Sequence, residues 1–164
     1  MAFFPKQTYI ERRRQIKEKV GSGLLLFFGN NEAPCNYPAN GYNFRQDSTF
    51  LYFFGIQRDG LVGVIDIDED KEYLFGDDID IEDIIWTGFV PSVKELAEEV
   101  GITNTASMRG LHDLIRKKVG NIHYLPPYRH DIMIQIEDLL GIPALKTRRR
   151  SLKAMLLKIS PTQN

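Results

Sequence analysis

The sequence predicts an α/β domain in which helices cover a mixed β-sheet. Three observations lead to this prediction. Short apolar runs such as residues 24–28 are typical of buried strands. Segments with helical spacing of apolar residues end at glycines, as at Gly101. The two kinds of segment are interleaved along a chain of 164 residues, which is the size of one domain.

The first helix is predicted over residues 9–20. Thr8 and Glu11 have the spacing of a capping box at its start, and Gly21 follows its end. Residues 24–28 are then expected to form a buried strand.

The next segments alternate between loop and strand. Residues 30–43 are rich in Asn, Pro and Gly and predict a long loop, which in a compact domain is usually functional or mobile. The aromatic run 49–54 predicts a strand. Residues 61–67 and 72–75 flank an acidic turn and predict a hairpin, which supplies the antiparallel part of the sheet.

The second half is mostly helical. Ser92 and Glu95 predict a capping box that begins a helix ending at Gly101. The further expected elements are a loop with a helical turn over 77–83, a helix before Gly120, a strand over 122–125, a helix before Gly141 and an amphipathic segment with Leu152, Met155, Leu156 and Ile159.

The composition excludes several classes of partner. Hydrophobic residues make up 43% and charged residues 26%, as in soluble globular proteins. The net charge of −1 gives no pull toward nucleic acid or anionic membranes, and no apolar run approaches the length of a membrane span or a secretion signal. With Cys35 as the single cysteine, no internal disulfide can form. We therefore expect a cytoplasmic protein without nucleic-acid or membrane partners.

No metal site is predicted. The three histidines, His112, His123 and His130, lack the i, i+4 spacing of a zinc helix, and there is no Cys-x-x-Cys. An acidic group lacks the order of ligands in a calcium loop and is expected to be a solvated loop; its members are Asp77, Asp78, Asp80, Glu82 and Asp83.

Nucleophile and phosphate motifs are also incomplete. Cys35 has no cationic neighbour that would activate its thiol, and neither Gly-x-Ser-x-Gly nor a glycine-rich phosphate loop occurs. The arginine triplets 12–14 and 148–150 could bind phosphate, but the surrounding acids favour solvated faces. The residues alone therefore predict a fold without a complete active site.

One motif indicates a family. "FRQDSTFLYFFG", residues 44–55, resembles the signature of the amino-terminal domain of the creatinase/aminopeptidase P group, which contains Xaa-Pro aminopeptidases and prolidases. Weaker elements of that group follow in the same order: "ERRRQI" (11–16), "GVIDIDEDKEYLF" (63–75), "EDIIWTG" (82–88) and "LKAMLLKISPTQ" (152–163). The last one departs from the family at Gln163, where Glu is usual.

The resemblance implies a domain organisation. Residues 1–158 would form the non-catalytic N-terminal domain, a three-layer, ribonuclease-H-like α/β sandwich, and residues 159–164 would begin the hinge to a catalytic domain absent from this chain. In this family that catalytic domain holds two divalent metal ions, commonly manganese. We therefore expect no cofactor in this chain and no activity from it alone.

The resemblance also implies a function. The parent would be a metal-dependent Xaa-Pro aminopeptidase, which removes the N-terminal residue preceding proline. This domain would contribute to oligomerisation and shape the substrate cleft, so its partners would be its own catalytic domain, neighbouring subunits and proline-containing peptides. Three alternatives stay open: the domain of an Xaa-Pro dipeptidase, a non-enzymatic peptidase-like protein-binding module, and a standalone ligand-binding protein. "ERRRQI" favours the aminopeptidase.

The resemblance also suggests roles for individual residues. Arg45 is expected to pair locally, with substrate contact as the alternative, and Asp47 or Ser48 is expected to satisfy loop backbone groups. Trp86 is either a core residue or a wall of a partner subunit's substrate cleft. The structural motif itself consists of Arg45, Gln46, Asp47, Ser48 and Gly55.

Overall fold

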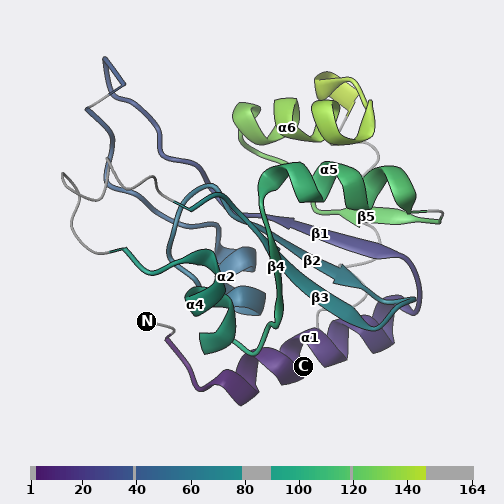
Figure 1. The fold of residues 1–164 in the computed structure, drawn as a ribbon. Coiled ribbons are helices and arrows are strands. Elements are labelled where there is room, and N and C mark those ends of the chain that lie inside the picture. The colour runs from purple at the N-terminus through teal and green to yellow at the C-terminus, as the bar shows by residue number, and fades with distance from the viewer. Residues whose placement is uncertain (1–2, 39, 79–89, 119, 147–164) are drawn as a thin grey trace, which may run out of the picture.

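The computed structural model describes residues 3–38, 40–78, 90–118 and 120–146. A five-stranded sheet with the order β4-β3-β2-β1-β5 forms the middle layer. Helices α1, α2 and α4 cover one face of the sheet, and α5 and α6 cover the other (Figure 1). The predicted α/β sandwich is therefore confirmed.

The sheet is mixed, as predicted. The central strands β1 (Leu24–Phe28), β2 (Val62–Asp66) and β3 (Lys71–Phe75) pair antiparallel. The two outer strands each pair parallel with a neighbour, β5 (Ile122–Tyr124) with β1 and β4 (Asn104–Ala106) with β3. The predicted hairpin and the strands at 24–28 and 122–125 are confirmed, whereas β4 was not predicted because it is short and two of its three residues are polar.

Alternate side chains of β1 enter two separate cores. Leu25 and Phe27 pack with the layer formed by α1 (Lys6–Val20), α2 (Ser48–Phe54) and α4 (Val93–Glu99). Leu24 and Leu26 pack with the layer formed by α5 (Met108–Lys117) and α6 (His130–Leu140). A strand that is buried on both faces needs a continuous apolar run, which explains the composition of residues 24–28.

The prediction of a strand over residues 49–54 is wrong, because this segment is helix α2. The Asp47 carboxylate accepts hydrogen bonds from the backbone N–H groups of Thr49 and Phe50, which fixes the first turn. Gly55 ends the helix with a φ of 65°, and a Cβ there would lie 2.2 Å from the Tyr9 ring. These two caps outweigh the β-propensity of the aromatic residues between them.

The first helix also differs from the prediction at its start. α1 begins at Lys6 after Pro5, and the Thr8 amide donates to the Pro5 carbonyl (2.9 Å), so Thr8 lies inside the helix and caps nothing. The second predicted capping box is confirmed, since Ser92 and Glu95 bond each other's backbone in both directions.

The first arginine triplet was expected on a solvated face, and this is wrong for Arg13. Arg14 is exposed and pairs with Glu11 and Glu18, as a surface residue does. Arg13 is fully buried: its Nε lies 2.6 Å from Glu72 Oε2 on β3, and its terminal nitrogens donate to the carbonyls of Phe53 and Val100. One side chain therefore joins α1 to the sheet and to the ends of α2 and α4.

Several predictions fall outside the described residues. These are the helical turn near residues 79–83, Trp86, the second arginine triplet (148–150), the amphipathic segment with Leu152, Met155, Leu156 and Ile159, and the boundary between 1–158 and 159–164. Of the helices that the structure describes, none has the length and apolar character to cross a membrane.

Candidate functional site

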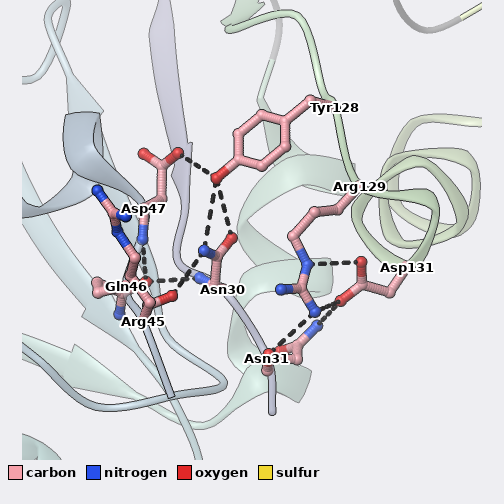
Figure 2. A network of polar contacts seen from close by, with 8 residues as sticks. All are labelled: Asn30, Asn31, Arg45, Gln46, Asp47, Tyr128, Arg129 and Asp131. Carbon is pink, nitrogen blue, oxygen red and sulfur yellow. Dashed lines mark hydrogen bonds and ion pairs between the residues drawn. The ribbon is translucent and has the colours of Figure 1, made fainter. Parts of the chain in front are cut away.

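The candidate site lies at the edge of the sheet where two neighbouring parallel strands end. β1 leads into Asn30 and Asn31, and β5 leads through two prolines into Tyr128. The segment 45–48 lies beside both (Figure 2). In α/β sheets the carboxyl ends of adjacent parallel strands are the usual place for ligands, because the connections leaving them form a crevice.

Gln46 forms the floor of the site. It is 2% exposed, and its Oε1 accepts hydrogen bonds from the backbone amides of Asn30 (2.6 Å) and Asp47 (2.9 Å). Its Nε2 donates to the Arg58 carbonyl (2.6 Å). This one buried amide therefore ties the end of β1 to α2 and to the loop that precedes β2.

Tyr128 closes the network from the opposite side. Its hydroxyl donates to Asp47 Oδ2 (3.0 Å) and lies 3.4 Å from the Asn30 amide group, which itself donates to the Arg45 carbonyl (2.9 Å) (Figure 2). Desolvation of the hydroxyl and the nearby Asp47 carboxylate raise the pKa of Tyr128. Tyr128 therefore stays protonated at neutral pH and acts as the hydrogen-bond donor.

A second cluster extends the site toward α6. Arg129 contacts Asp131 through Nε (3.0 Å) and Nη2 (3.1 Å), and the same Nη2 donates to the Asn31 carbonyl (3.0 Å). The Asn31 side chain donates to Asp131 Oδ2 (3.0 Å). Burial raises the pKa of Asp131, but the hydrogen bonds from Arg129 and Asn31 outweigh this effect and lower it overall. Asp131 is thus ionised at neutral pH, with both oxygens engaged.

Between these clusters runs a groove of about 410 Å³. Tyr42 and Tyr128 line it, with 65% and 59% of their surface exposed. We call it the strand-end groove, and its lining residues are Asn30, Asn31, Ala33, Tyr42, Asn43, Phe44, Arg45, Gln46, Ser48, Tyr128 and Arg129.

Some motif residues stabilise the local backbone, whereas the side chain of Arg45 is exposed. Asp47 satisfies backbone groups, as expected for Asp47 or Ser48, and Gly55 is required by the left-handed turn after α2. Arg45 is exposed, and within residues 3–38, 40–78, 90–118 and 120–146 its guanidinium makes no hydrogen bond or ion pair. The local pairing expected for the Arg45 side chain is therefore not found in the described part of the chain.

The Asp47 cap leads to the first prediction. Asp47→Ala removes both bonds to the first turn of α2 and the acceptor for Tyr128, so we expect the free energy of unfolding to fall by about 1–2 kcal/mol. Asp47→Asn keeps a side-chain oxygen that can cap and should cost less than half as much. Urea denaturation of both variants measures the difference; equal losses would mean that charge, not capping, is what Asp47 supplies.

Neither the histidines nor the acids form a metal centre in the part of the chain that the structure describes. No three His, Cys, Asp or Glu side chains there are close enough to hold a metal ion. His112 faces Asp138 (3.4 Å), His123 lies 3.3 Å from the Ser22 carbonyl, and His130 begins α6.

Two members of the acidic group instead bond to helix starts. Asp78 accepts from the backbone amide of Val93 (2.7 Å), and Asp77 accepts from that of Met108 (3.1 Å). Cys35 is exposed in the loop after β1.

Sequence reasoning missed Asn30, Asn31, Tyr128, Arg129 and Asp131 as site residues. A signal was present, because Asn30 and Tyr128 each follow a predicted strand within a few residues. To use this signal, one would have had to know that strands 24–28 and 122–125 are parallel neighbours, and their composition does not reveal this.

Comparison with solved structures identifies the class of domain. The fold is similar to Pseudomonas aeruginosa aminopeptidase PepP, with a TM-score of 0.73 at 19% identity over 92% of this chain and 35% of that one. It is also similar to a His354Ala form of Escherichia coli aminopeptidase P, with a TM-score of 0.70 at 20% identity over 89% of this chain and 34% of that one. The chain thus has the α/β fold found in one part of these aminopeptidases.

The family follows from the sequence match. Residues 9–124 match the family described as "Aminopeptidase P, N-terminal domain", and the chain belongs to this family. It is 28% identical to human Xaa-Pro dipeptidase over 97 residues, which is 59% of this chain and 20% of that protein. It is 30% identical to the mitochondrial intermediate cleaving peptidase 55 of Arabidopsis thaliana over 92 residues, which is 56% of this chain and 18% of that protein.

The matched regions are parts of longer proteins. The chain spans about a third of the solved chains and about a fifth of these two relatives. Escherichia coli aminopeptidase P has also been solved in a zinc-substituted form with product, so members of the family bind metal.

Proposed function

We propose that this chain is the non-catalytic N-terminal domain of a metal-dependent Xaa-Pro aminopeptidase that removes the N-terminal residue preceding proline. The observation that carries the proposal is the family match over residues 9–124. Two divalent metal ions, which we propose to be manganese, would be held by a catalytic domain outside this chain and would supply the activated water for peptide hydrolysis.

Within such an enzyme the domain would shape the substrate cleft and contribute to oligomerisation. Two features support this role: the loop after β1 extends away from the layers (Figure 1), and exposed Tyr37 and Tyr42 lie on it. Surfaces of this kind suit contact with a catalytic domain or a neighbouring subunit. Trp86 stays a prediction as a wall of the cleft. The cytoplasmic location, with neither nucleic acid nor membrane as partner, is likewise our inference from composition.

Two alternatives have support of their own. The likeness to human Xaa-Pro dipeptidase favours a parent that cleaves dipeptides only. A protein-binding module without catalysis would keep the fold but would lack metal ligands in the rest of its parent. The complete reading frame, assayed on Xaa-Pro dipeptides and on longer Xaa-Pro peptides, separates all three, since the aminopeptidase alone cleaves the longer ones.

The isolated chain gives the second prediction. Purified residues 1–164 with added manganese should release no amino acid from Xaa-Pro peptides, whereas the product of the complete reading frame should do so. To exclude contamination, the chain is expressed in a host strain whose own proline-specific peptidase has been deleted or inactivated. Proline-specific release by the isolated chain would contradict the assignment of catalysis to another domain.

A further inference from the structure

We propose that the strand-end groove binds an extended, proline-containing peptide segment. This inference rests on the proposed function for the source of the peptide, which would be substrate chain beyond the cleaved bond. It assigns the contact to Tyr42 and Tyr128, two residues that the structure brings together from opposite halves of the chain.

The groove is preorganised, because its polar floor is already satisfied. Gln46 and Asn30 are 2% and 7% exposed, and each makes its hydrogen bonds within the network. Among the described residues, no buried side-chain nitrogen or oxygen lacks a partner. The floor of the groove is therefore fixed before a ligand binds, which reduces the entropy lost on binding.

The groove offers hydrogen-bond donors, and no carboxylate is among the described residues that line it. The two carboxylates of the adjoining network are occupied. Asp47 accepts from α2 and from Tyr128, and Asp131 accepts from Arg129 and Asn31. In the described part of the chain, the Arg45 guanidinium has no partner, and Arg129 commits only its Nε and Nη2. A ligand for such a surface should bring acceptors and should not require carboxylate partners for its own N–H groups.

A proline-containing segment meets that requirement. In the polyproline II conformation the chain has no internal hydrogen bonds, so its carbonyls are free to accept, and proline has no N–H to satisfy. Its rings also pack on aromatic side chains, which is how other aromatic-lined grooves recognise such segments. The exposed rings of Tyr42 and Tyr128 supply these surfaces. The groove volume, about 410 Å³, lies in the range of small-ligand sites.

Binding can be measured with the whole 164-residue chain, without any catalysis. The probe is acetyl-Ala-Pro-Pro-Ala-Pro-amide, and the matched probe has alanine at each proline. Both ends are blocked, so neither an amine nor a carboxylate contributes. We expect isothermal titration calorimetry to give saturable binding of the proline probe and at least about tenfold weaker binding of the alanine probe.

Two tyrosines of one loop give a matched pair of variants. Tyr42→Ala should weaken binding of the proline probe by about fivefold or more, because it removes an aromatic wall. Tyr37→Ala should leave binding unchanged, since Tyr37 is similarly exposed (56%) on the same loop but does not line the groove. Thermal melts of both variants should match the wild type, because both side chains are exposed.

The inference would be overturned if the proline probe does not bind up to about 1 mM, a range that covers weak peptide recognition. It would also be overturned if both probes bind equally, or if Tyr42→Ala and Tyr37→Ala have equal effects. Binding of a free-acid peptide alone would also overturn it and would make the groove a carboxylate site. If the complete protein cleaves Xaa-Pro peptides and this chain binds neither probe, only this inference fails. If the probe binds but the complete protein cleaves nothing, only the proposed function fails.

Discussion

Arg13→Met should lower the free energy of unfolding by about 3–5 kcal/mol, the range for removing one partner of a buried charged network. Methionine replaces the apolar stem of the arginine but not its guanidinium, so packing of the stem stays and most of the loss comes from polar groups. The substitution leaves the buried carbonyl of Val100 and the partly buried carbonyl of Phe53 without this donor, and a buried group that loses its partner costs about 1–3 kcal/mol. Glu72 keeps its contact with Lys17 (3.0 Å), so its charge is only partly uncompensated.

The charge of Arg13 survives its burial. Burial lowers the pKa of the Arg13 guanidinium, and Glu72 acts in the opposite direction. Because an arginine starts so far above neutral pH, the side chain remains a cation in the folded protein. The fork of the guanidinium matters as well, since three separate acceptors surround it. Arg13→Lys should therefore recover only part of the lost stability.

Arg14 provides the matched control. It is adjacent in the triplet, but its side chain is 52% exposed and its partners Glu11 and Glu18 lie on the surface of the same helix. Exposed pairs contribute little, so Arg14→Met should change the free energy of unfolding by less than about 0.5 kcal/mol. Urea denaturation of both variants measures the contrast. Similar losses of stability for the two variants would mean that Arg13 contributes mainly through helix formation and not through its buried hydrogen bonds to other elements.

Sequence reasoning predicted the elements whose signals are local. The continuous apolar run of β1 and the Ser92–Glu95 capping box each depend on a few neighbouring residues, and both are confirmed. The same reasoning failed at residues 49–54, where aromatic composition predicted a strand. Asp47 and Gly55 flank that segment with the spacing of a seven-residue helix. Their capping signals were available and should have outweighed β-propensity, which depends strongly on context.

Arg13 and the strand-end groove were beyond local reasoning for a different reason. A triplet of arginines does not reveal which member faces the core, because Phe53, Glu72 and Val100 are 40, 59 and 87 residues away. In the groove, the resemblance singled out Arg45, Gln46 and Ser48 but not the residues after β5. Those residues reach the site only because β5 lies beside β1 in the sheet.

Gln46→Leu should lower the free energy of unfolding by about 3 kcal/mol. Leucine has a similar size and suits a buried position, so burying the new side chain does not itself destabilise the fold. The substitution removes the acceptor for the amides of Asn30 and Asp47 and the donor for the Arg58 carbonyl. Three backbone groups then lose their partners, and water entering from the groove can compensate only part of the loss.

The same change should loosen the site before it unfolds the domain. Gln46 holds Asn30, the second residue after β1, so amide hydrogen exchange of Asn30 should accelerate more than that of Leu25 within the strand. Gln57→Leu is the matched control, because Gln57 is exposed in the following loop and should tolerate leucine within about 0.5 kcal/mol.

Gln46→Glu distinguishes a hydrogen-bonding role of Gln46 from a role in filling space. The carboxylate keeps an acceptor for Asn30 and Asp47 but turns an oxygen toward the Arg58 carbonyl. If hydrogen bonding is the cause, this variant should unfold at low denaturant near neutral pH and regain stability as the pH falls and the carboxyl is protonated, because a protonated carboxyl can donate to that carbonyl again. The folded-state pKa of the new carboxyl would then lie above its unfolded value, so the stability recovered at low pH is lost as pH rises through the folded pKa. A Gln46→Glu variant whose stability does not depend on pH in this way would show that Gln46 serves only to fill space.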